Sequence, residues 1–245
     1  MLVLGIEAAT PVASVGIVDG EKVLAERLIN NGRTHSINLL PMIKALLEDA
    51  GVEPGSLDGI AVSSGPGSFT GLRIGLATAK TLAQVWEIPV VGVSTLDVLA
   101  HGLHGNVAVI CPILNAKKNE VYTAVYRINQ YLLPECSVGP LAVSIENLAD
   151  ILQMDNGYSG LVMFLGDGVP VYQEKILTYL GGRAIFAPPA LSFPRGAVVA
   201  QLGLDLLNKG LGVNPLELLP EYIRLSEAEL IWLRKQEANK TKNEC

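Results

Sequence analysis

The chain has 245 residues, which is long enough for two lobes that each bury a core. It carries 18 Lys and Arg against 24 Asp and Glu, and no basic run is long enough to follow a phosphate backbone, which argues against independent, tight nucleic-acid binding. Hydrophobic residues make up 49%, yet no apolar run approaches the roughly 18–20 residues of a membrane span, so buried parallel strands or an apolar interface are expected instead.

The cysteines and the N-terminus bear on the compartment. Cys111, Cys136 and Cys245 are odd in number, lie far apart and form no CxxC pair, so we expect reduced thiols. The start of the chain lacks the cationic segment, apolar core and cleavage site of a signal peptide. We therefore expect a cytoplasmic protein with no membrane attachment.

The first fifty residues combine strands with one helix. Three short β-type runs form a meander, at 2–8, 12–18 and 22–29. From His35 the apolar spacing becomes helical and stops at Gly51, a typical helix C-cap. Pro41 falls inside this stripe and predicts a kink or a late start.

The rest of the chain continues in an α/β order that then repeats. A strand at 59–63, a helix at 70–86, a strand at 90–93 and a helix at 95–103 complete the first half. After residue 105 a second set of strands and helices follows. This order predicts an α/β fold of the actin-like type, shared by Hsp70 and sugar-kinase ATPases, with two lobes on mixed sheets. We expect an N-terminal lobe at 1–104, a C-terminal lobe at 105–225 and a charged tail at 226–245.

Residues 65–75 read GPGSFTGLRIG, and the glycines of this loop could cradle a phosphate at a helix N-terminus. The spacing fits neither standard fingerprint, because the third glycine comes one residue too late for a dinucleotide loop. Lys80 follows Ala79 inside the helix, where a P-loop needs glycine before its lysine. If nucleotide binds, the candidate residues are Glu7, at the end of the first strand, and Thr10.

The alternative reading of the loop is close packing. Gly71, Gly75 and Ala79 recur every four residues and line one face, where small side chains let another helix approach. A second apolar face serves the chain's own sheet, so we predict a subunit interface made with the first helix, or, as the alternative, a purely intramolecular core. The predicted interface consists of His35, Leu39, Met42, Ile43, Leu46, Gly71, Leu72, Gly75, Thr78, Ala79 and Leu82.

No motif indicates hydrolytic or metal chemistry. His101 and His104 are spaced i, i+3, but glycines flank them and no carboxylate is near. Neither a GxSxG elbow nor an HExxH helix is present. We expect no catalytic residue and no metal site.

The glycine loop, together with GIEAAT at 5–10 and the HS and LLPMI segments at 35–43, resembles the TsaB (YeaZ) family of bacterial subunits for threonylcarbamoyladenosine synthesis on tRNA. The resemblance covers essentially residues 1–224. Later landmarks are LGDG at 165–168 and PEYIR at 220–224. The segment NAKKNEVY at 115–122 departs from the family's usual Asp-Ala-Arg-Arg-Gly-Glu-Val-Tyr.

This resemblance implies an actin-like fold and a non-catalytic role beside TsaD, the subunit that transfers the threonylcarbamoyl group. It implies direct binding to TsaD, a complex that includes the ATPase TsaE, and contact with tRNA only through that complex. Because an apolar helix pair left without its partner is self-complementary, a homodimer of the isolated chain is the further expectation. No cofactor is expected in the isolated chain, and ATP or ADP is expected only in the assembly. Thr95 and Leu99 stand where TsaD has two metal-binding histidines, and neither side chain replaces an imidazole. The rival readings are an ATP-dependent kinase of the same fold and a glycoprotease-like peptidase.

Overall fold

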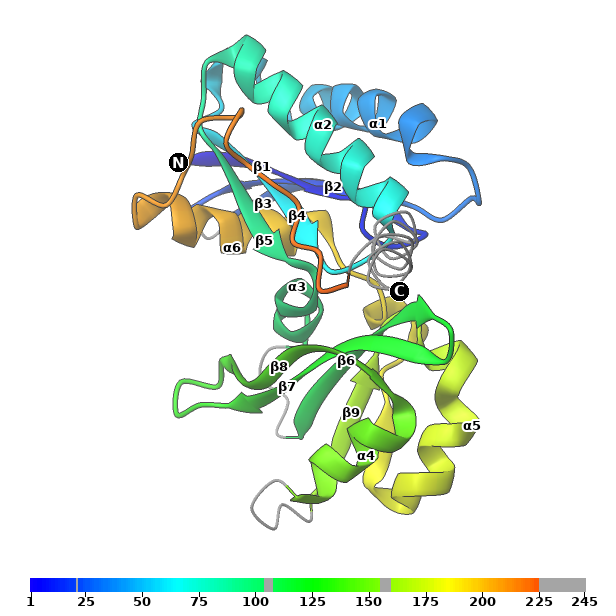
Figure 1. Cartoon of the computed structure of the whole chain (residues 1–245). Helices are drawn as coiled ribbons and strands as arrows, with labels where there is room; N and C mark the ends of the chain where they lie inside the picture. The colour runs from blue at the N-terminus through cyan, green and yellow to red at the C-terminus, as the bar shows by residue number, and fades with distance from the viewer. Residues whose placement is uncertain (21, 104–107, 155–159, 225–245) are drawn as a thin grey trace, which may run out of the picture.

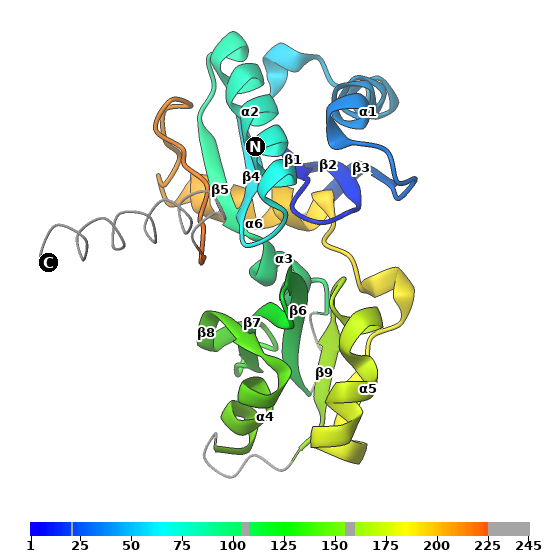
Figure 2. The ribbon, with the colours of Figure 1, turned by 45° about the vertical axis from the view of Figure 1, so that its right-hand side comes forward.

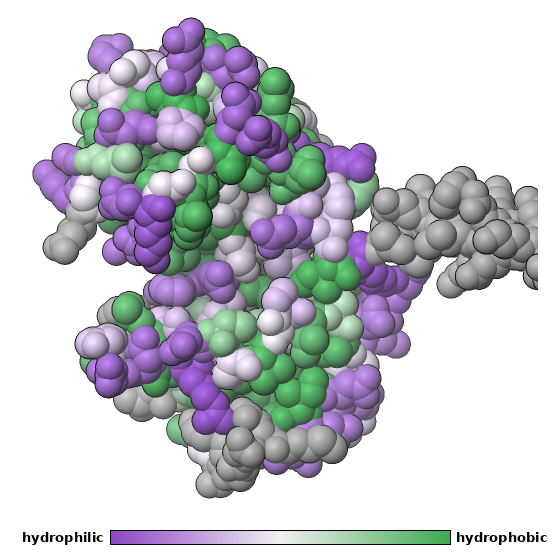
Figure 3. Space-filling model, turned by 60° about the vertical axis from the view of Figure 1, so that its left-hand side comes forward, coloured by the Kyte–Doolittle hydropathy of each residue, from purple (hydrophilic) through white to green (hydrophobic). Residues whose placement is uncertain are grey.

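The computed structural model of the chain describes residues 1–20, 22–103, 108–154 and 160–224. These residues form two lobes, each built on a five-stranded mixed sheet (Figures 1 and 2). An indentation separates the lobes on one side of the molecular surface (Figure 3). The predicted charged tail at 226–245 lies outside the described residues.

The first lobe has helices on both faces of its sheet. Its strands are β1 (Leu2–Glu7), β2 (Ala13–Asp19), β3 (Lys22–Ile29), β4 (Gly59–Gly65) and β5 (Val90–Ser94). They lie in the order β3-β2-β1-β4-β5, with β1 antiparallel to β2 and parallel to β4. The helices α1 (His35–Ala50) and α2 (Phe69–Trp86) cover one face, and α6 (Gly196–Asn208) covers the other (Figure 1). The helix α1 runs through Pro41 without interruption.

The second lobe repeats this plan. Its strands are β6 (Val109–Lys117), β7 (Glu120–Ile128), β8 (Pro134–Ser144), β9 (Val162–Leu165) and β10 (Ala184–Phe186). Their order is β10-β9-β6-β7-β8, so in both lobes the first strand pairs antiparallel with the second and parallel with the fourth. The helices α4 (Ile145–Met154) and α5 (Val169–Leu180) cover one face, and α3 (Thr95–His101) packs on the other, between the lobes (Figure 2). The predicted actin-like fold with two lobes on mixed sheets is confirmed.

The predicted lobe boundary at residue 225 is corrected, because the chain returns to the first lobe much earlier. The helix α6 contributes Val199, Ala200 and Leu204 to a core shared with β1, β4 and β5. Residues 210–224, which we call the C-terminal strap, then run along α2 and the edge of β5. Val213 forms a β-bridge with Val90, and the Lys80 ammonium donates to the carbonyls of Leu216 (3.3 Å) and Leu218 (2.9 Å).

The helices carry no membrane-spanning pattern. In the ranges that the structure describes, none of them combines the length and the apolar character that crossing a bilayer requires.

Candidate functional site

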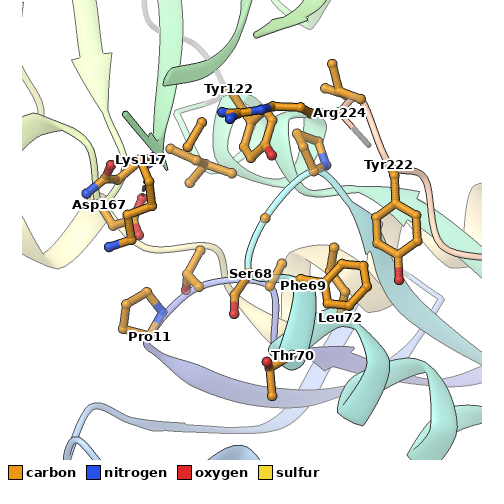
Figure 4. A pocket seen from close by; sticks show the side chains of 18 of the residues that line it. Pro11, Ser68, Phe69, Thr70, Leu72, Lys117, Tyr122, Asp167, Tyr222 and Arg224 are labelled. Atoms are coloured by element: carbon orange, nitrogen blue, oxygen red, sulfur yellow. Dashed lines mark hydrogen bonds between the residues drawn. The ribbon is translucent and has the colours of Figure 1, made fainter. Parts of the chain in front are cut away.

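The two lobes and the strap enclose a cleft of about 790 Å³ (Figure 4). The first lobe contributes Thr10 and Pro11 from the β1–β2 turn, together with the glycine loop. From the second lobe come the β6–β7 hairpin and the loop after β9, and the strap closes the remaining side. The lining comprises residues 9–11, His35, residues 66–70, Leu72, Arg73, residues 114–118, Tyr122, Asp167 and residues 221–224.

The glycine loop is the junction at which these segments meet. A Cβ on Gly67 would lie 2.4 Å from the Ala9 carbonyl oxygen, and one on Gly71 would lie 2.1 Å from that of Ala8. The Ser68 amide donates to the Ala9 carbonyl at 2.7 Å across the same contact. These glycines therefore allow the start of α2 to approach the β1–β2 turn, and close packing within the chain accounts for them.

Aromatic and cationic side chains attach the strap to the start of α2. The rings of Phe69 and Tyr222 stack with centroids 5.0 Å apart. The Arg73 guanidinium lies 3.8 Å from the centre of the Phe69 ring, and its Nε donates to the Tyr222 hydroxyl at 3.1 Å. At the other end of this junction, the Glu221 amide donates to the Ser64 carbonyl at 2.8 Å. The strap is thereby held as a wall of the cleft (Figure 4).

Glu7 lies behind the cleft and is fully buried. The Ala9 amide donates to its Oε1 at 2.6 Å, and the Ser63 hydroxyl donates to its Oε2. Burial raises the pKa of Glu7 to about 7, and these hydrogen bonds offset only part of that effect. The carboxyl group is occupied within the first lobe and is not among the residues that line the cleft.

Thr10, the second candidate nucleotide residue, does line the cleft, but its polar groups have local partners. Its hydroxyl accepts from the Val12 amide at 3.3 Å, and its carbonyl accepts from His35 Nε2 at 2.8 Å. The other ring nitrogen of His35 is buried and finds no partner among the described residues. His35 therefore fastens α1 to the β1–β2 turn.

Charges of both signs face each other across the second-lobe wall. The Asn115 amide donates to Asp167 Oδ1 at 3.0 Å, and burial raises the pKa of Asp167 while the hydrogen bond and Lys117 lower it. Arg224, the last described residue, pairs with Glu120 at 2.7 Å. Among the described residues there is no group of three His, Cys, Asp or Glu side chains that could hold a metal.

The predicted interface residues are mostly buried in the first lobe's own core. Gly75 illustrates the reason, since a Cβ there would lie 3.1 Å from the Ala8 Cβ. Thr78 and Leu82 are half-buried. Nine of the eleven are buried, namely His35, Leu39, Met42, Ile43, Leu46, Gly71, Leu72, Gly75 and Ala79. The assignment of these nine to an interface is corrected, because they contact the chain's own sheet and turn, as the intramolecular alternative expects.

Beside these buried positions, some apolar side chains of the same helices are exposed, while Ile74 and Leu82 are half-buried against the first lobe's core. We call Ile37 and Leu40 on α1, with Ile74, Thr78, Leu82 and Val85 on α2, the outer face. Ile37 is 59% exposed, Leu40 55% and Val85 70%. On α2 the spacing of three or four residues places these side chains on one stripe. Leu40 and Leu82 also line a groove between the two helices.

Thr95 and Leu99 lie away from the cleft. Both are fully buried on α3, and Leu99 belongs to a core with β6 and β7 of the second lobe. The Thr95 hydroxyl has no hydrogen-bond partner in the described part of the chain.

Sequence reasoning did not foresee that the cleft joins the strap to the second lobe. Lys117, Tyr122, Asp167 and Arg224 come from three separate segments. The available signal was that the segments at 165–168 and 220–224 are the later landmarks of the family resemblance, whereas the segment at 115–122 departs from the family's pattern.

Several known proteins are similar to this chain in sequence. A family model described as "TsaD: tRNA N6-adenosine threonylcarbamoyltransferase" matches residues 22–232. The "tRNA threonylcarbamoyladenosine biosynthesis protein TsaB" of Bacillus subtilis (strain 168) is 34% identical over 96% of this chain and 100% of its own length. The chain belongs to the TsaB family.

Other members of the TsaB family support this assignment over most of their length. The TsaB of Haemophilus influenzae is 30% identical over 91% of this chain and 94% of its own. A crystal structure from Pseudomonas aeruginosa, described as an uncharacterized protein with similarity to peptidase YEAZ, matches with a TM-score of 0.78. It is 26% identical and covers 91% of this chain and 99% of that one.

The close approach of α2 to the β1–β2 turn predicts the effect of Gly71→Ala. The added methyl group collides with backbone at Ala8, so we expect the free energy of unfolding to fall by about 1–3 kcal/mol despite the better helix propensity of alanine. Urea unfolding measures the free energy of unfolding of each variant. Gly55→Ala is the matched control, because no atom lies within 4 Å of its Cβ position. Equal stabilities of the two variants would contradict the packing role of Gly71.

The buried carboxyl group of Glu7 predicts a pH-dependent stability. Its pKa is about 7 in the folded chain against an ordinary value of 4.5, so the folded state binds the proton more tightly. The free energy of unfolding therefore falls as pH rises through this interval, by up to about 3 kcal/mol from this group. Glu7→Gln should remove that part of the pH dependence between about pH 4.5 and about pH 7. Glu135→Gln, at an exposed position of β8, is the control. A slope unchanged by Glu7→Gln would refute the assignment.

Proposed function

We propose that this chain is a partner subunit, without a complete active site of its own, in the synthesis of threonylcarbamoyladenosine on tRNA. It binds TsaD, the subunit that transfers the threonylcarbamoyl group, through the outer face of α1 and α2. The observation that carries this proposal is the group of exposed apolar side chains, Ile37, Leu40 and Val85, on two adjacent helices of a TsaB-family chain.

The pathway is supported by the relatives. Those from B. subtilis and H. influenzae are named tRNA threonylcarbamoyladenosine biosynthesis proteins, and their alignments span most of this chain. The matching family model is described as the transferase itself. A catalytic and a partner subunit of related fold can pair through corresponding helices, as in a pseudo-symmetric dimer.

The shape and chemistry of the outer face suit a helix-to-helix contact. Ile74, Thr78 and Leu82 follow one another at intervals of four residues along α2. Ile37 and Leu40 extend the apolar surface onto α1. Exposed apolar side chains beside half-buried ones form a patch that marks an interaction site. Without TsaD the same surface can pair with a second copy of the chain.

The non-catalytic part of the proposal rests on where the candidate catalytic groups lie. Glu7 is enclosed by its bonds to Ala9 and Ser63 and does not face the cleft. Thr95 and Leu99, in place of TsaD's metal ligands, are buried in a core. In this scheme TsaE and ATP or ADP act in the assembled cytoplasmic complex, and tRNA is contacted only through that complex.

A charge on the outer face tests the proposal. Leu40→Arg should weaken binding to TsaD at least tenfold, about 1.4 kcal/mol, because the guanidinium would have to be desolvated against an apolar partner. Titration calorimetry with purified TsaD measures the affinity. Leu40 is 55% exposed, so the substitution leaves the core of the chain intact.

The matched control is Val171→Arg on α5, where the replaced side chain is 59% exposed on the second lobe. It should leave TsaD binding unchanged. Undiminished binding of Leu40→Arg would overturn the assigned surface. Metal-dependent ATP turnover by the pure chain would instead favour the kinase reading.

A further inference from the structure

A second groove, with a volume of about 850 Å³, lies between α2 and the C-terminal strap. It adjoins the cleft between the lobes, with which it shares Arg73 and Tyr222, and it shares no lining residue with the α1–α2 groove. Apolar side chains gather on the first lobe in Figure 3. The residues that line the groove between α2 and the strap are Arg73, Leu76, Ala77, Lys80, Thr81, Gln84, Val85, Leu216, Leu218, Leu219, Pro220 and Tyr222.

Large apolar side chains border this groove without cover. Leu216 is 75% exposed, Leu219 71% and Val85 70%. Burying a leucine or valine side chain stabilises a protein by about 1.5–3 kcal/mol, so an occupant of this groove gains substantially from the contact.

We infer that the groove is the docking site of the chain's own C-terminal segment, residues 225–233. The described chain ends at Arg224, two residues after Tyr222, which lines the groove. The sequence that follows, LSEAELIWL, contains Leu225, Leu230, Ile231, Trp232 and Leu233. Residues 234–245, in contrast, contain no Leu, Ile, Val, Met, Phe, Tyr or Trp. The apolar part of the tail is thus the part that follows Arg224 directly along the chain.

The length of this segment matches the groove. From Arg73 to Val85, α2 rises by about 18 Å. Nine residues span up to about 30 Å when extended and about 14 Å as a helix, so the segment can follow most of the groove in either form.

The charges of segment and groove are complementary. Two cations, Arg73 and Lys80, line the α2 side, while the segment carries Glu227 and Glu229 before its main apolar run.

The segment is tethered to the strap that borders the groove. Its effective concentration there therefore reaches about the millimolar range, which favours the chain's own tail over a second copy.

The experiment uses the two tryptophans of the chain. In a Trp86→Phe background, Trp232 is the remaining tryptophan, and its fluorescence reports on the tail. We expect Trp232 to be shielded from acrylamide in the folded full-length chain. Adding Leu219→Glu to this background should raise the quenching constant several-fold and shift the emission to longer wavelength. Leu216→Glu, on the same rim, should act in the same direction.

Val171→Glu on α5 is the control and should leave the quenching unchanged, since its side chain is similarly exposed but distant from the groove. Circular dichroism verifies that each variant is folded. The inference is overturned if Trp232 is quenched as readily as in the urea-unfolded chain, or if both groove variants leave it shielded. Shielding that disappears on dilution together with a fall in sedimenting mass would also overturn it, because the occupant would then be a second copy. None of these outcomes depends on TsaD, so failure here leaves the proposed function standing.

Discussion

The contact between the start of α2 and the β1–β2 turn holds the functional end of this molecule together. Gly67 and Gly71 bring the helix against the backbone of Ala8 and Ala9, at distances that leave no room for a side chain. Thr10, in the same turn, receives the hydrogen bond of His35 and so anchors α1. The strap joins the same point through Glu221 and Ser64. One close backbone contact therefore sets the positions of both helices, the strap and the near wall of the cleft.

This arrangement bears on the proposed role of the first lobe as a binding surface. Small residues that could have held a phosphate are used to seat α2 on its own sheet, and the acidic group at the end of β1 is bonded internally. Residues on the inner sides of α1 and α2 pack in the first lobe's core, so binding of a partner to the proposed outer face would require little ordering of these helices.

Much of the architecture was predictable because it depends on local patterns. The helix expected at 70–86 is observed as Phe69–Trp86, and the repeated strand order indicated two related lobes. Periodicity identifies the apolar side of a helix but not the element that covers it, so the stripe through Gly71 and Gly75 was assigned to a partner when it contacts Ala8. For the same reason, nothing in residues 196–208 specified which sheet α6 would cover.

The cleft was harder to predict than the fold. Its charged residues, among them Lys117, Asp167 and Arg224, are separated by 50 residues or more along the chain and meet only through the lobe arrangement. The environment of Glu7 likewise depends on Ser63, which is 56 positions away. Contacts between residues so far apart in sequence leave no pattern in local residue spacing, and the family resemblance marked as landmarks only the segments that hold Asp167 and Arg224.

The return of α6 to the first lobe has a consequence for the folding of the nascent chain during translation. The second lobe is one continuous stretch of chain, and its sheet and helices have all been synthesised by about residue 187. The first sheet, although begun earlier, has one bare side until residue 208 emerges. The nascent chain therefore finishes its later-encoded half before its earlier one, and translational arrest in between leaves an apolar sheet exposed to chaperones.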